Sequence, residues 1–72
     1  MTKPLAMKNT IRIERAVMNI TQQDLAEKIG VSRQTINAIE SNKYVPSTVL
    51  ALKMAKLFQK KVDDIFILEE TD

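Results

Sequence analysis

The chain has a single glycine, Gly30, which stands between two segments that each carry the signals of a short helix. The first segment opens at Thr21, a capping residue with an aspartate three positions on, and continues with an apolar stripe. The second opens at Ser32 and also keeps its apolar side chains on one face. Glycine adopts the left-handed conformation that ends many helices. The sequence therefore predicts helices over about 21–29 and 32–41, joined by a turn of about three residues.

The remaining segments predict three more helices around this pair. Apolar residues at helical spacing indicate one helix from about Thr10 to Met18 and another from Ser47 to about Gln59. A short helix over Val62–Ile65 follows, and the β-branched and aromatic content of IFILEE indicates a brief strand. The predicted organisation is a loose, flexible leader over 1–8, one folded domain over 9–66, and a C-terminal strand with an acidic tail over 66–72.

The composition argues against several classes of function. The 72 residues include neither cysteine nor histidine, so disulfides, thiolate nucleophiles and conventional zinc ligands are excluded. No segment approaches the roughly 18 apolar residues of a membrane span, and no signal peptide opens the chain. We therefore expect a cytoplasmic protein that is not an enzyme and that uses no cofactor, no metal and no membrane.

Charge is divided unevenly along the chain. Residues 1–61 carry all 11 Lys and Arg but only four acids, whereas the last eleven residues carry five acids and no base. This asymmetry is typical of a body that faces a polyanion and an end that faces away from it. A solvated surface with an acidic tail explains the charges equally well.

The outward face of the helix over 32–41 is unusual for a solvated surface. With Ile36 and Ile39 directed inward, the opposite side carries Gln34 and Ala38, with Asn37 on one shoulder. Amide side chains match the donor and acceptor of adenine in the major groove, and the arginine at the leading end of the helix matches guanine. The residues alone leave two readings open, a solvated polar face and a surface that reads DNA bases.

The segment TQQDLAEKIGVSRQTINAIESNKYVPS resembles the Cro/C1-type (XRE) helix-turn-helix domain of phage repressors and small prokaryotic regulators. In that pattern a polar residue is followed at set intervals by a small residue, a glycine and a β-branched residue. In this chain the four positions are occupied, in that order, by Gln22, Ala26, Gly30 and Ile36. The resemblance covers about residues 9–66. It implies an all-α, compact five-helix fold of the lambda repressor-like kind, with a short C-terminal β-strand used in dimerisation.

The resemblance also implies residue roles at a nucleic-acid interface. Base reading falls to the helix over 32–41, at Arg33, Gln34, Thr35, Asn37 and Ala38. Contacts with the DNA backbone fall to the start of the preceding helix, to the cap and to the following loop, at Thr21, Gln22, Gln23, Ser32, Asn42, Lys43 and Tyr44. Arg15 and Glu40 both lie on inward stripes, and the resemblance implies that they form a buried or half-buried salt bridge.

A single recognition helix reads only a few base pairs, so regulators of this kind usually bind palindromic operators as dimers. Large apolar residues gather towards the C-terminus, and we expect the homodimer interface there, at Leu57, Phe58, Ile65, Phe66, Ile67 and Leu68. The implied function is a sequence-specific regulator that binds double-stranded DNA at the nucleoid. The preferred form is a repressor that occludes polymerase and has no small-molecule ligand domain.

Two alternatives remain open at this point. An antitoxin-like module would bind DNA but chiefly neutralise a protein partner, and the short C-terminal segment weighs against it. A protein-bridging domain would keep the fold without binding DNA, and such a domain is expected to lack Gln22, Arg33 or Gln34, all of which are present.

Overall fold

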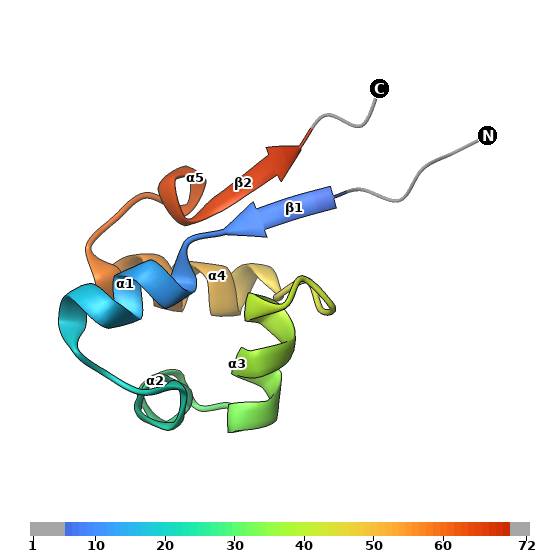
Figure 1. Ribbon diagram of the computed structural model, residues 1–72. Coiled ribbons are helices and arrows are strands. Elements are labelled where there is room, and N and C mark those ends of the chain that lie inside the picture. The colour runs from blue at the N-terminus through green and yellow to red at the C-terminus, as the bar shows by residue number, and fades with distance from the viewer. Residues whose placement is uncertain (1–5, 70–72) are drawn as a thin grey trace.

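The computed structural model of the chain describes residues 6–69. Five helices and a two-stranded antiparallel sheet follow one another along the chain (Figure 1): β1 (Ala6–Asn9), α1 (Ile11–Met18), α2 (Gln22–Ile29), α3 (Arg33–Glu40), α4 (Thr48–Phe58), α5 (Val62–Ile65) and β2 (Phe66–Glu69). In Figure 1 the sheet lies at one side of the helices, and α2 and α3 lie at the other. The five-helix fold predicted from the sequence is confirmed.

The turn between α2 and α3 is made by the residues that the sequence indicated. The Thr21 side chain accepts a hydrogen bond from the Asp24 amide at 3.0 Å, and the Asp24 carboxylate accepts one from the Thr21 amide at 3.0 Å. Gly30 ends α2 in the left-handed conformation, with φ of 81°. Ser32 then caps α3 by accepting a hydrogen bond from the Thr35 amide at 3.1 Å. Only one residue, Val31, separates the end of one helix from the cap of the next.

Gly30→Ala is expected to lower the free energy of unfolding by about 1–2 kcal/mol, the cost of a left-handed backbone for a residue with a Cβ. Apart from the adjoining backbone, no atom lies within 4 Å of the position that this Cβ would occupy, so the backbone conformation sets the effect. Gly30→Asn should cost less, because asparagine tolerates the left-handed region better. Urea denaturation of the three chains checks this, and equal losses for Ala and Asn would point to a steric cause instead.

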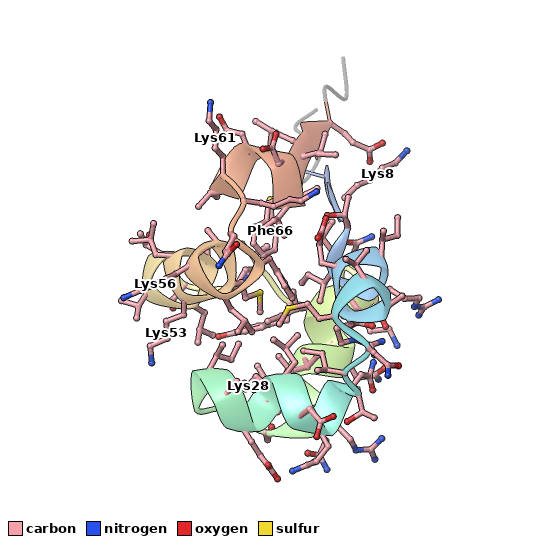
Figure 2. All side chains as sticks on the ribbon, turned by 90° about the vertical axis from the view of Figure 1, so that its left-hand side faces the viewer. Lys8, Lys28, Lys53, Lys56, Lys61 and Phe66 are labelled. Carbon is pink, nitrogen blue, oxygen red and sulfur yellow. The ribbon has the colours of Figure 1, made fainter. Side chains whose placement is uncertain are left out.

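The hydrophobic core lies between the helices and beneath the sheet. Ala26 is completely buried, which lets α3 approach α2 closely. Figure 2 shows Phe66, the first residue of β2, among the side chains of the interior. All the helices and β2 contribute to this cluster, whose buried members are Ile11, Leu25, Ala26, Ile29, Ile36, Ile39, Met54, Phe58, Ile65 and Phe66.

The prediction of a flexible leader over 1–8 is wrong for residues 6–8, which belong to β1. Met7 lies opposite Leu68 in the register of the sheet and packs against the core. Asn9, the last residue of β1, links the strand to α3, because its Nδ2 donates a hydrogen bond to the carbonyl of Ile39 at 2.9 Å. The folded unit therefore begins before the predicted residue 9, whereas the C-terminal strand expected from residue 66 is present as β2. The parts of the leader and acidic tail predicted over 1–5 and 70–72 lie outside the described residues.

The predicted dimer interface is wrong for three of its six residues. Phe58, Ile65 and Phe66 are buried in the core of the single chain, at 7%, 0% and 8% exposure. Leu57 is half-buried and packs against the same core. A domain of this size needs these side chains for its own interior. Ile67 and Leu68 are exposed, and one edge of their strand is already paired with β1.

Candidate nucleic-acid interface

The outward side of α3 carries polar side chains without lysine. Ile36 and Ile39 are buried against the rest of the domain, which fixes the rotation of the helix. Arg33, Gln34 and Asn37 are consequently exposed. Thr35 and Ala38, which were also predicted to read bases, are half-buried at the margins of this face. The hydroxyl of Thr35 also shares a 3.0 Å hydrogen bond with the hydroxyl of Ser32, so it is partly occupied within the helix cap.

The start of α2 lies beside this face. An open depression on the surface is lined by Thr21, Gln22 and Gln23 together with Arg33 from α3 and Arg15 from α1. The backbone N–H groups of a helix start point outward and Arg33 adds positive charge, so this depression suits an anion, while the charge of Arg15 is paired with Glu40.

The capping box at this helix start also has an electrostatic consequence. Hydrogen bonds from the backbone and side chain of Thr21, with a smaller contribution from Lys28, hold the pKa of Asp24 below its usual range. A carboxylate with a lowered pKa stabilises the fold at pH values above its ordinary pKa, and this contribution is lost as the pH falls through the lowered value.

Glu40 connects three helices beneath the polar face. Its side chain is only 2% exposed, and it forms a salt bridge with Arg15 of α1, with Nε of the arginine 2.6 Å from Oε2. Nη2 of the same arginine donates to Oε1 at 3.2 Å, and Nη1 donates to the carbonyl of Ile20 at 3.2 Å. Arg12 approaches the carboxylate from the solvent side at 3.8 Å. The ion pair expected between Arg15 and Glu40 is thus present, and it is a two-point contact.

Gln22 takes part in the same network, which the sequence did not indicate. Its Nε2 donates to Oε1 of Glu40 at 3.1 Å and to Oδ1 of Asn37 at 3.3 Å. Both protons of the side-chain amide are therefore used within the protein. Sequence reasoning assigned Gln22 to a DNA phosphate, and a contact of that kind is left to its backbone N–H.

The loop after α3 also differs in detail from the expectation. The backbone amides of Asn42 and Lys43 donate to the carbonyls of Ile39 and Ala38, at 3.0 and 2.9 Å, and so cap the helix instead of facing outward. The Asn42 side chain accepts a hydrogen bond from Asn9 at 3.1 Å. The side chains of Lys43 and Tyr44 are exposed and remain accessible to an anion.

The lysines labelled in Figure 2 lie on elements other than α3, and Lys8 and Lys61 are at the end of the molecule opposite α2. Arg33 is the only basic residue of α3. Figure 2 labels lysines on other elements: Lys8 on β1, Lys28 on α2, Lys53 and Lys56 on α4, and Lys61 at the cap of α5. An outward helix face with directional amide and guanidinium donors and no lysine is typical of a surface that reads base edges.

Within residues 6–69, no cluster of acidic side chains could hold a metal ion. Among these residues, no helix is long and apolar enough to span a membrane.

Comparison with known proteins gives a consistent result. A family model described as helix-turn-helix matches residues 11–65. An uncharacterized HTH-type transcriptional regulator of Methanocaldococcus jannaschii is 58% identical over 66 residues, which are 92% of this chain and 100% of that protein. Another from Bacillus subtilis is 50% identical over 64 residues, covering 89% of this chain and 97% of the relative.

A solved structure is similar as well. The crystal structure of a candidate DNA-binding protein from Bacteroides fragilis superposes with a TM-score of 0.73 at 33% identity, covering 83% of this chain and 97% of that one. The family model, which matches residues 11–65, spans all five helices, α1 to α5.

Proposed function

The chain belongs to the XRE-type helix-turn-helix family of transcriptional regulators, and from this premise we propose that it is a homodimeric repressor that binds a palindromic operator. The observation that carries the proposal is the exposed set of Arg33, Gln34 and Asn37 on α3, directly beside the start of α2. In this proposal α3 enters the major groove and the start of α2 rests on the sugar–phosphate backbone. Bound to a promoter, the dimer prevents access of the polymerase.

The proposed division of labour follows the chemistry of the side chains. Arg33 can donate two hydrogen bonds to guanine, and the amide of Gln34 matches adenine. Thr35 and Ala38 are secondary, because both are half-buried at the margins of the face. The backbone contacts that we propose involve the two helix starts and the loop after α3, at Thr21, Gln22, Gln23, Ser32, Asn42, Lys43 and Tyr44.

We propose that the homodimer forms through the exposed side chains of β2. One recognition helix covers too few base pairs to select a genomic site, so two must be held about 34 Å apart, one turn of DNA. Ile67 and Leu68 are 45% and 63% exposed and lie on the side of the molecule opposite α2 and α3 (Figure 1), so a contact there leaves the recognition helices free. The acidic residues near this end would then point away from DNA.

Fluorescence anisotropy over a salt series tests the proposal, with the duplex upstream of the protein's own gene and a scrambled duplex as probes. Salt-dependent binding that favours the native sequence by at least about 1,000-fold is expected for a specific regulator. Equal binding to both duplexes would place the operator elsewhere, and a selection from a randomised duplex library would then identify it. Failure to bind any duplex at low salt would reject the proposal and favour a function through a protein partner.

Gln34→Ala is expected to weaken binding to the selected duplex by about 1–3 kcal/mol and to relax the preference at one base pair. Lys43→Ala is the matched control, because it removes an exposed side chain that carries charge but no base-reading geometry. The control should weaken all duplexes alike and reduce the salt slope by about one. Uniform weakening by Gln34→Ala across all sequences would contradict its role as a base reader.

A further inference from the structure

A chain of three polar side chains runs from the interior of the domain to its polar face. Glu40 of α3 is the buried end, with 2% of its side chain exposed. Gln22 of α2 is the half-buried middle, and it donates to Glu40 at 3.1 Å and to Asn37 at 3.3 Å. Asn37 is the exposed end, one helical turn before Glu40 on the same helix. The chain thus crosses from α3 to α2 and returns to α3.

The direction of every hydrogen bond in this chain is fixed by its buried end. An ionised carboxylate can only accept, so the Gln22 amide must turn its nitrogen towards Glu40. The second proton on that nitrogen is directed at Asn37, so Asn37 must present its oxygen in return. Arg15 holds the carboxylate in place through two contacts of 2.6 and 3.2 Å, which prevents it from rotating away. The amide of Asn37 is therefore oriented by a group that it does not touch.

We propose that Gln22 is a positioning residue that fixes the amide of Asn37 with its oxygen inward, so that Asn37 acts towards DNA as a donor only. The proposal rests on the proposed function, because it concerns how α3 reads base pairs. A free asparagine amide pairs with adenine through two hydrogen bonds. Its oxygen accepts from the N6 amino group of the base, and its nitrogen donates to N7. With Oδ1 turned towards Gln22, the groups that Asn37 presents to DNA are the two protons of Nδ2.

The base chemistry that fits this arrangement is guanine. Guanine shows two acceptors in the major groove, N7 and O6, whereas adenine shows one acceptor beside an amino group. An amide that offers only protons meets two acceptors on guanine, but on adenine it meets an amino group that also donates. We expect guanine over adenine by roughly tenfold at the base pair that Asn37 faces, the lower part of the range for one side-chain contact.

Gln22→Met is the variant that tests the orientation. Methionine has a similar length and fits an irregular, half-buried position, but it donates no hydrogen bond. Glu40 keeps both contacts with Arg15, so the ion pair remains. Once released, the Asn37 amide can turn and pair with adenine. The matched control for base preference is Gln23→Met, a neighbouring glutamine of α2 whose Nε2 donates to Glu27 at 3.0 Å and not to Asn37. Because Gln23 is a proposed backbone contact, this control is expected to weaken all duplexes alike and to leave the base preference unchanged.

The measurement is a selection of each full-length chain against a randomised duplex library. It is followed by anisotropy on the selected duplex with all four bases tested at each position, and circular dichroism confirms that each variant is folded. Asn37→Ala first identifies the base pair that depends on Asn37. At that pair the wild type and Gln23→Met should favour guanine, and Gln22→Met should shift the preference towards adenine by at least about fivefold. The double variant Gln22→Met/Asn37→Ala should show no preference there.

Several results would overturn the inference while the proposed function stands. These are a wild-type preference for adenine at the Asn37-dependent pair, an unchanged preference in Gln22→Met, or selective binding in which no pair depends on Asn37. A purely structural role for Gln22 would weaken binding to all duplexes alike and leave the base preference unmoved. If the wild type binds no duplex, the proposed function fails, and the inference fails with it.

Discussion

A chain carrying Arg15→Met is expected to lose about 3–5 kcal/mol of its free energy of unfolding, the cost of leaving a buried charge without its partner. Glu40 is almost fully buried and has Arg15 as its nearest cation, at 2.6 Å. The hydrogen bond from Gln22 would remain, but an amide does not neutralise a carboxylate. A loss of this size is a large part of the stability of a small domain. Urea denaturation at neutral pH, followed by circular dichroism, measures it.

Arg12→Met is the control, because Arg12 approaches the same carboxylate at 3.8 Å while 79% of its side chain is exposed. An exposed ion pair contributes about 0–1 kcal/mol, so this variant should unfold almost as the wild type does. The double variant Arg15→Met/Glu40→Met removes both charges and should recover much of the loss. Equal effects of the two arginine variants would show that burial of Glu40 does not set the energetics.

Leu68→Glu is expected to convert the proposed dimer into a monomer and to weaken binding to the full operator by about 100-fold or more. Leu68 is 63% exposed on β2, and a charge there would have to be buried in a contact between two copies. When the two copies no longer bind together, each recognition helix must find its half-site independently, and the gain from linked binding is lost. Sedimentation velocity measures the mass, and anisotropy measures the affinity.

Ile13→Glu is the matched control for this experiment. Ile13 is 61% exposed on α1, so the substitution carries the same change of charge at nearly the same exposure. It should leave the mass unchanged and alter DNA affinity only as one extra negative charge does. If Leu68→Glu retained the mass of a dimer, the interface would lie elsewhere on the surface. If the wild type itself were a monomer at the concentrations that bind DNA, the dimer proposal would fail.

The helices and their ends could be predicted from the sequence because their causes are local. The capping box at Thr21, the left-handed glycine at Gly30 and the cap at Ser32 each act within four residues of the position that they define. Strand β1 could not be predicted in the same way. The segment AMKN is too short for a period, and its stability comes from a partner strand at the far end of the chain.

The exposed residues of the candidate site followed from helical periodicity, whereas their connections did not. Once Ile36 faces inward, Gln34 must face outward and Asn37 must lie on one shoulder of the same face. The hydrogen bond between Gln22 and Asn37 depends on the angle between α2 and α3 and on two side-chain rotamers. Burial of Glu14 next to Lys60, at 3.2 Å, likewise arises only when α1 meets the end of α4. Contacts of this kind are set by packing, which a periodic pattern does not record.

The pairing of β1 with β2 also has a consequence for the order in which the protein is made. Ala6 and Glu69 are partners in the sheet, so almost the whole described chain lies between the two strands. During synthesis β1 leaves the ribosome first and has nothing to pair with until β2 has followed. The segments that form α1 to α4 are available earlier, and local contacts form faster than those that close a long loop. Nascent chains from which β2 has not yet emerged therefore lack the completed sheet, and if that sheet joins two copies, assembly must wait until β2 is available.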